Sequence, residues 1–224
     1  MTAPTERRTA PVWKRPKVIG GVLAVALLGA IAATTTTVSA SDPEAAAAAG
    51  GSTFDAVQYA EERYAAEVVP NIQENAVPIT ELLPQIIDDP EAAGEQYGHR
   101  SGSSSPYAYP TSGEGVAGAV DGTLLPLTIE GLPDDVQVMI QIGPAINGTA
   151  LRDATGLVDF NDFLNQIEYA NAATELNNKV KSDVLADFDA AGAEGKTVRF
   201  VGAFAYGNNP AVLQVTPVEL EVTQ

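Results

Sequence analysis

The spacing of apolar residues changes at residues 101–106, and this change limits the fold more than any other feature of the sequence. Before it, apolar residues recur every three or four positions, which is the period of an amphipathic helix. After it, apolar and polar residues alternate, as along residues 136–142, which is typical of a half-buried strand. A helical part followed by extended segments, without regular alternation of the two, predicts an α+β fold.

The helical part is predicted over residues 53–98. Thr53 stands before the first apolar residue of the periodic pattern, so we expect it to cap the first helix. Pro70 is expected to kink this helix or to end it, because proline removes a backbone donor and its ring clashes with the preceding turn. Asp89 and Pro90 have the residue types of an N-cap and a first helical position.

The extended part is predicted as strands within residues 105–150 and 196–223, with one long amphipathic helix over residues 159–190 between them. Many short strands joined by Gly-rich turns predict a small antiparallel, OB-like β-barrel that carries the helical subdomain. The long helix is expected to bury one apolar face. Its members are Phe160, Phe163, Leu164, Ile167, Leu176, Val180, Val184 and Phe188.

The N-terminus has the three parts of an export signal: basic residues, an uncharged apolar run over residues 18–33, and small residues that end at Ala40. The basic residues keep the N-terminus in the cytoplasm, so the rest of the chain is expected outside the membrane. Cleavage near Ala40 and retention as a transmembrane signal-anchor helix both remain open. The predicted organisation is a cytoplasmic segment 1–17, a signal peptide or anchor 18–40, an Ala/Gly-rich tether 41–52 and one extracytoplasmic domain 53–224.

The charge and the absence of cysteine exclude several functions. The chain carries 12 basic and 29 acidic residues, a net charge of −17, and contains no cysteine. A strongly acidic surface repels phosphate backbones, so nucleic-acid binding is not expected. Without cysteine there is no disulfide, no thiol catalysis and no cysteine that could carry a lipid.

Two motifs that could indicate catalysis lack the context that the chemistry needs. Gly113, Gly115 and Gly118 match a dinucleotide fingerprint by letter, but an extended segment follows them where a helix N-terminus would have to meet the pyrophosphate. They are more simply a glycine-rich hairpin. His99 is the sole histidine, and no nucleophile-elbow motif accompanies it. We expect it to be exposed and without a catalytic role.

The acidic residues do not form a metal-binding motif. Asp159, Asn161 and Asp162 only partly match a calcium loop, because the central glycine and the closing glutamate are missing. Asp159 is more simply the cap of a helix that begins at Phe160. No metal and no cofactor is expected.

One segment is unusually polar for its place between apolar positions, and one interpretation is that it lines a polar binding groove. Its candidate binding residues are Asn147, Arg152, Asp153, Asn165, Gln166 and Glu168. Arg152 and Asp153 are the expected ion pair. The second interpretation, which the sequence favours, is that these side chains satisfy backbone groups where a strand passes into a helix.

Four segments resemble a family of predicted bacterial periplasmic lipoproteins of unknown function: residues 54–77, 143–154, 160–177 and 216–222. The resemblance implies a small β-barrel-like part with a helical subdomain. It also implies a relation to accessory proteins encoded beside sugar-type ABC importers. The family has no established activity, so it assigns no catalytic residue. The chain departs from the lipoprotein pattern because it has no cysteine to acylate.

The sequence therefore favours a non-enzymatic, exported and membrane-tethered accessory or binding protein, associated with a solute importer. Two alternatives stay open. One is an envelope glycan hydrolase that uses an Asp/Glu pair, which the many acidic residues neither single out nor exclude. The other is a purely structural envelope module. The sequence does not predict an oligomeric state.

Overall fold

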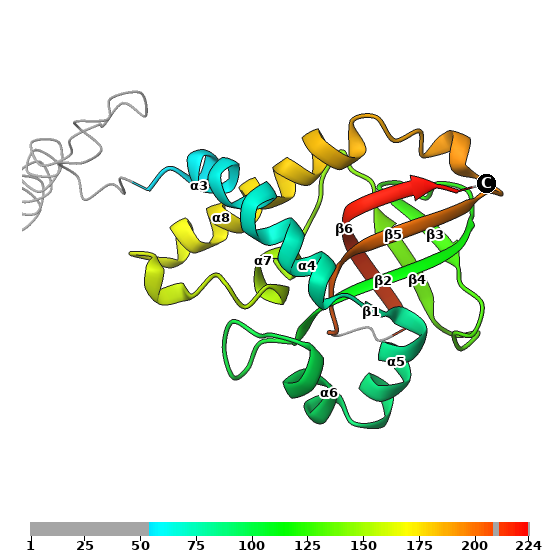
Figure 1. Ribbon diagram of the computed structural model, residues 1–224, viewed down its shortest axis with the longest axis horizontal. Helices are drawn as coiled ribbons and strands as arrows, with labels where there is room; N and C mark the ends of the chain where they lie inside the picture. The colour runs from blue at the N-terminus through cyan, green and yellow to red at the C-terminus, as the bar shows by residue number, and fades with distance from the viewer. Residues whose placement is uncertain (1–53, 208–210, 224) are drawn as a thin grey trace, which may run out of the picture. The chain divides into compact units, whose positions relative to one another are not determined.

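Five strands of the chain close into a barrel (Figure 1). The computed structural model describes residues 54–207 and 211–223. The strand order is β1-β2-β3-β4-β6-β5, and β5 also pairs with β2, which closes the barrel. The strands are β1 (Val77–Pro78), β2 (Ala108–Ala117), β3 (Leu124–Thr128), β4 (Gln137–Gln141), β5 (Thr197–Ala205) and β6 (Val212–Val222). The predicted α+β fold with an OB-like barrel is confirmed, although β1 pairs with β2 and β4 pairs with β6 in parallel.

The helices lie outside the barrel (Figure 1). They are α3 (Ala56–Arg63), α4 (Val69–Asn75), α5 (Ile79–Asp88), α6 (Pro90–Tyr97), α7 (Ala150–Ala154) and α8 (Gln166–Val180). No helix within the described residues is long and apolar enough to cross a membrane. The predicted export segment 18–40 and the tether 41–52 lie outside the described residues.

The first helix differs from the prediction at both ends. Asp55 caps α3 by accepting hydrogen bonds from two backbone N–H groups of its first turn, whereas the predicted cap, Thr53, lies outside the described residues. The helical path also continues past Pro70. A wider π turn, Tyr64–Val68, separates α3 from α4, so the proline falls in the first turn of α4. Proline is tolerated there because N–H groups of a first turn need no helical partner. The predicted cap at Asp89 is confirmed.

The predicted helix over residues 159–190 is divided into separate elements. Asp159 caps a short 3₁₀ turn, Phe160–Asp162, and α8 begins after Asn165. The break changes which side chains face the core, so that Leu164 is 82% exposed and Ile167 is 72% exposed. These two residues had been placed on the buried face. The sequence did not reveal this break, because the apolar residues keep their helical spacing across it. Phe163 and Asn165 nevertheless adopt extended backbone.

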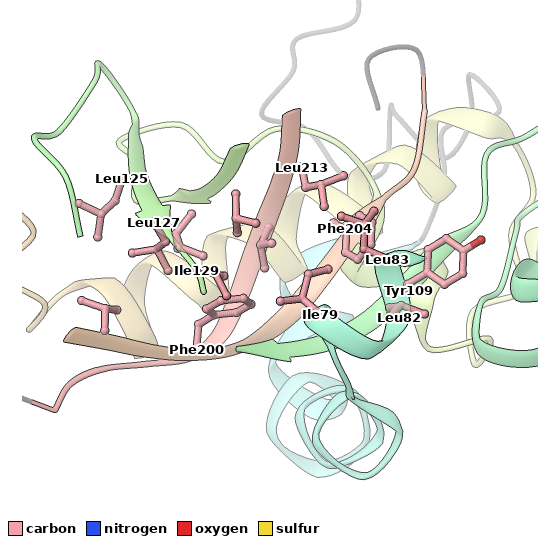
Figure 2. Packing of buried hydrophobic residues seen from close by; sticks show 14 of the residues in the cluster. Ile79, Leu82, Leu83, Tyr109, Leu125, Leu127, Ile129, Phe200, Phe204 and Leu213 are labelled. Atoms are coloured by element: carbon pink, nitrogen blue, oxygen red, sulfur yellow. The ribbon is translucent and has the colours of Figure 1, made fainter. Parts of the chain in front are cut away.

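The barrel interior is filled by large apolar side chains from all five strands, and Figure 2 shows this packing. Phe200 and Phe204 are fully buried, and the ring of Phe204 stacks on that of Tyr109 with centroids 5.5 Å apart. Helix α5 covers this core with Leu82 and Leu83, which are also fully buried. Burial raises the pKa of the Tyr109 hydroxyl to about 12.

The glycines that match the dinucleotide fingerprint serve close packing. Gly113 and Gly115 lie within β2. A Cβ atom at Gly115 would lie 2.6 Å from the carbonyl oxygen of Thr128, and one at Gly113 would lie 2.9 Å from the ring of Phe200. A strand without side chains at these positions can approach β3 and admit the Phe200 ring.

A second core joins the helices to the outside of the barrel. Side chains of α3, α4, α7 and α8 pack there against Ala108, Ala203 and Val218 of the strands. Tyr64 lies in this core at 2% exposure, and its hydroxyl has no hydrogen-bond partner among the residues that the structure describes. Burial raises the pKa of this hydroxyl.

Replacing Tyr64 with phenylalanine is expected to raise the free energy of unfolding by about 1 kcal/mol, because the change removes a buried polar group that gains no bond on folding. Urea denaturation followed by circular dichroism measures the effect. The matched control is Tyr169→Phe, whose hydroxyl lies 3.5 Å from Oδ1 of Asp153 and 3.4 Å from the carbonyl oxygen of Val158, so its single proton has an acceptor. We expect this control to lose stability. A loss of stability on Tyr64→Phe would show that its hydroxyl has a partner in solution.

Candidate functional site

The six side chains predicted to line one groove lie in three different places. Arg152 and Asp153 form an ion pair in α7, Asn165 and Glu168 cap α8, and Asn147 lies beside the barrel. Gln166 is exposed in the first turn of α8. Only part of the predicted set therefore comes together.

The ion pair of Arg152 and Asp153 is buried and fully bonded. The Nε and Nη2 atoms of Arg152 lie 2.8 and 2.7 Å from Oδ1 of Asp153. Its Nη1 atom donates to the backbone carbonyl of Tyr169 at 2.9 Å, and the guanidinium lies 3.5 Å from the centroid of that ring. Thr149 donates to the other carboxylate oxygen of Asp153 at 2.6 Å. The pair thus joins α7 to α8, and the expected ion pairing is confirmed.

Asn165 and Glu168 satisfy backbone groups at the start of α8, as the second interpretation of this segment expects. The Asn165 side chain accepts hydrogen bonds from the N–H groups of Ile167 and Glu168. The Glu168 carboxylate accepts in return from the N–H of Leu164 at 2.9 Å and from the Asn165 amide. This reciprocal arrangement is a form of capping box, and it satisfies donors that a helix start leaves free.

Asn147 is fixed by the barrel rather than by α8. Its backbone N–H donates to Oε1 of Gln141 at 2.8 Å, and its carbonyl accepts from Nε2 of the same side chain at 3.1 Å. Gln141 also donates to the hydroxyl of Thr216. The amide thus holds the loop that follows β4 against β6.

The predicted residue Asp153 also lines a small pocket of about 170 Å³. The other polar lining groups come from distant segments, namely residues 99–101 after α6 and Asp159 before the 3₁₀ turn. The rings of Phe160 and Tyr169 form part of its wall and lie edge to face, with centroids 5.4 Å apart. The pocket therefore combines charged groups of both signs with two aromatic rings.

Backbone pairing and one glycine position the first of these segments. His99 pairs with Ala108 as an antiparallel bridge, which ties the segment to the start of β2. Gly156 adopts a positive φ of 64°, and a Cβ atom there would lie 2.8 Å from the ring of His99. Glycine at this position allows the loop after α7 to reach the histidine. His99 itself is exposed, as expected.

One donor of the pocket, Arg100, is held by two residues that do not line the pocket. Arg100 pairs with Glu91 at 3.0 Å, and its guanidinium lies 4.3 Å from the centroid of the Tyr107 ring. Burial raises the pKa of the Tyr169 hydroxyl, although the nearby Arg152 lowers it. The hydroxyl therefore stays protonated at neutral pH and can donate a hydrogen bond.

Sequence reasoning missed Arg100, Phe160 and Tyr169 as pocket residues and interpreted Asp159 only as a cap. Asp159 does cap the 3₁₀ turn, while Phe160 had been assigned to a buried helix face. No motif links residues 99–101 with residues 153–169, because the fold alone brings them together. The described part of the chain contains no group of three or more His, Asp or Glu side chains that could hold a metal ion.

The chain is similar to a known protein family and to a solved structure. The model of a family described as predicted periplasmic lipoprotein (DUF2291) matches residues 22–221. The crystal structure of an OB-fold protein from Thermotoga maritima is similar, with a TM-score of 0.60 and 24% sequence identity. The similarity covers 77% of this chain and 100% of that one. It supports the fold alone. No curated protein matches the chain.

Proposed function

The chain belongs to the family of predicted periplasmic lipoproteins (DUF2291), and we propose that it is an exported, membrane-tethered binding protein for a small polar solute of the sugar type. The observation that carries this proposal is the convergence of Arg100, Asp153, Asp159 and two aromatic rings on one pocket. Hydroxyl groups both donate and accept hydrogen bonds, so a neutral polyol can use charged groups of both signs. The volume is below the range of drug-sized sites, and it suits one sugar ring.

We also propose that the protein acts as an accessory protein of a solute importer. Support comes from the resemblance of its motifs to proteins encoded beside sugar-type ABC importers. The membrane tether would be the N-terminal segment, since the chain has no cysteine that could carry a lipid. Crosslinking in native membranes, followed by mass spectrometry of the captured proteins, tests this part. Enrichment of importer subunits over an unrelated tethered control supports it, and recovery of the bait alone overturns it.

Solute binding is tested by calorimetric titration of the full chain with a panel of neutral monosaccharides. Asp159→Asn removes the charge, while the amide oxygen can still cap the 3₁₀ turn. We expect this variant to bind about tenfold more weakly, because a hydrogen bond to a charged group is stronger than one to a neutral group. Arg199→Gln is the matched control, since Arg199 is 52% exposed on β5 and outside the pocket. Absence of any binding to the unaltered chain would overturn the proposal.

The same pocket contains the two carboxylates that a glycan hydrolase would need, Asp153 and Asp159. Both oxygens of Asp153 are already engaged by Arg152 and Thr149, and Asp159 holds the backbone of its own turn. These contacts suit fixed binding groups better than groups that must exchange protons with a substrate. Release of reducing sugar from envelope glycans, lost in Asp159→Asn, would instead establish the hydrolase.

A further inference from the structure

Two aliphatic side chains project into solvent at the start of α8. Leu164 and Ile167 are the most exposed of the large hydrophobic residues in the described part of the chain. Their backbone is nevertheless fixed. The N–H of Leu164 donates to Glu168, and the N–H of Ile167 donates to Asn165. The capping interactions therefore present both side chains outward from a rigid turn.

This turn lies at the end of the fold where the described chain begins. Phe163, next to Leu164, packs against the ring of Phe54 with centroids 5.1 Å apart and against Tyr59 at 5.6 Å. Figure 1 shows the start of α3 beside α8 at this end of the molecule. The segment that precedes residue 54 is therefore covalently joined next to the two exposed side chains.

The length of the preceding segment limits how far this end can be from a membrane. The uncharged apolar run ends at Ala33, and residues 34–53 connect it to Phe54. At roughly 3.3 to 3.6 Å per residue, this connection reaches at most about 70 Å even when fully extended. A tether of that length gives the turn a high effective concentration at the membrane surface, so a small apolar contact is enough for binding.

We propose that Leu164 and Ile167 insert into the lipid surface of the membrane that holds the N-terminal segment. The inference rests on the tethered part of the proposed function and not on solute binding. Asp159 and Asp162 are exposed close by in the sequence, and carboxylates are repelled by anionic headgroups. The surface therefore suits zwitterionic lipid, with the aliphatic side chains between the acyl chains and the carboxylates in the headgroup layer.

The test uses the full chain reconstituted into phosphatidylcholine vesicles. Because the chain has no cysteine, Leu164→Cys and Ile167→Cys each provide a single attachment point for an environment-sensitive fluorophore. Replacement at such exposed positions leaves the core intact. Ile87→Cys is the matched control, an isoleucine that is 52% exposed on α5. Quenching by lipids that carry a nitroxide on the acyl chain reports contact with the bilayer interior.

We expect quenching by lipid to be at least about twofold stronger at positions 164 and 167 than at position 87, and to weaken when phosphatidylglycerol replaces phosphatidylcholine. Equal quenching at all three positions in vesicle-bound protein overturns the docking but leaves the tether in place. Failure of the chain to stay with the vesicles overturns both. If the fluorophores at positions 164 and 167 report an apolar environment in native membranes but not in phosphatidylcholine vesicles, a membrane protein covers the two side chains. That result too overturns the proposal.

Discussion

Replacing Asp153 with alanine is expected to lower the free energy of unfolding by about 3 to 5 kcal/mol, because it leaves the Arg152 guanidinium buried without its counter-charge. The Arg152 side chain is 5% exposed and that of Asp153 is 9% exposed. The remaining contacts of Arg152, to the carbonyl and the ring of Tyr169, do not neutralise its charge.

Two controls separate burial from charge in this measurement. Arg199 and Glu221 approach to 2.7 Å, but their side chains are 52% and 55% exposed, so Glu221→Ala is expected to cost less than about 1 kcal/mol. The double variant Arg152→Leu, Asp153→Ala is expected to be more stable than Asp153→Ala alone, because it removes the stranded charge. Urea denaturation gives all three values. Equal losses for Asp153→Ala and Glu221→Ala would contradict the explanation.

Replacing Phe200 with alanine is expected to lower the free energy of unfolding by about 3 to 5 kcal/mol. Phe200 is fully buried in the barrel, and its ring lies against Gly113, which has no side chain to move into the vacated space (Figure 2). The cavity would therefore persist. Guanidinium denaturation measures the loss.

The matched control for Phe200 is Phe160→Ala, since Phe160 is 39% exposed. Its replacement removes less buried area and opens no enclosed cavity, so we expect a smaller loss of stability. Losses of the same size for both variants would show that the barrel interior rearranges to fill the space.

Strand prediction succeeded for β6 and failed within β2. Strands were predicted within residues 196–223, and β6 lies there, because alternation and flanking turn residues agree in this segment. In contrast, Gly113 and Gly115 had been assigned to a glycine-rich hairpin, whereas both lie inside β2. Glycine usually interrupts a strand, but here it continues one. The close approach of Phe200 that requires it comes from residues far along the chain.

The candidate site was harder to predict than the strands, because it is formed by residues that are distant in the sequence. The pair of Arg152 and Asp153 could be predicted because the residues are adjacent and opposite in charge within an apolar setting. The pocket could not, because its wall includes His99 and Arg100, which the pairing with β2 brings to α7. The break before α8 was also hidden, since Leu164 and Ile167 continue the helical spacing of apolar residues although Asn165 starts a new helix.

The way in which the barrel closes affects when the exported chain can fold. Strand β5 pairs with β2 along its whole length, joining partners as distant as Ala108 and Ala205, and β6 lies between β4 and β5. Pairing between such distant segments slows folding, because the long loop must close before its contacts form. If the chain emerges from the membrane N-terminus first, β2 stays without its β5 partner until residues 197–205 have followed. The order of strands is therefore expected to delay closure of the barrel until both β5 and β6 are present.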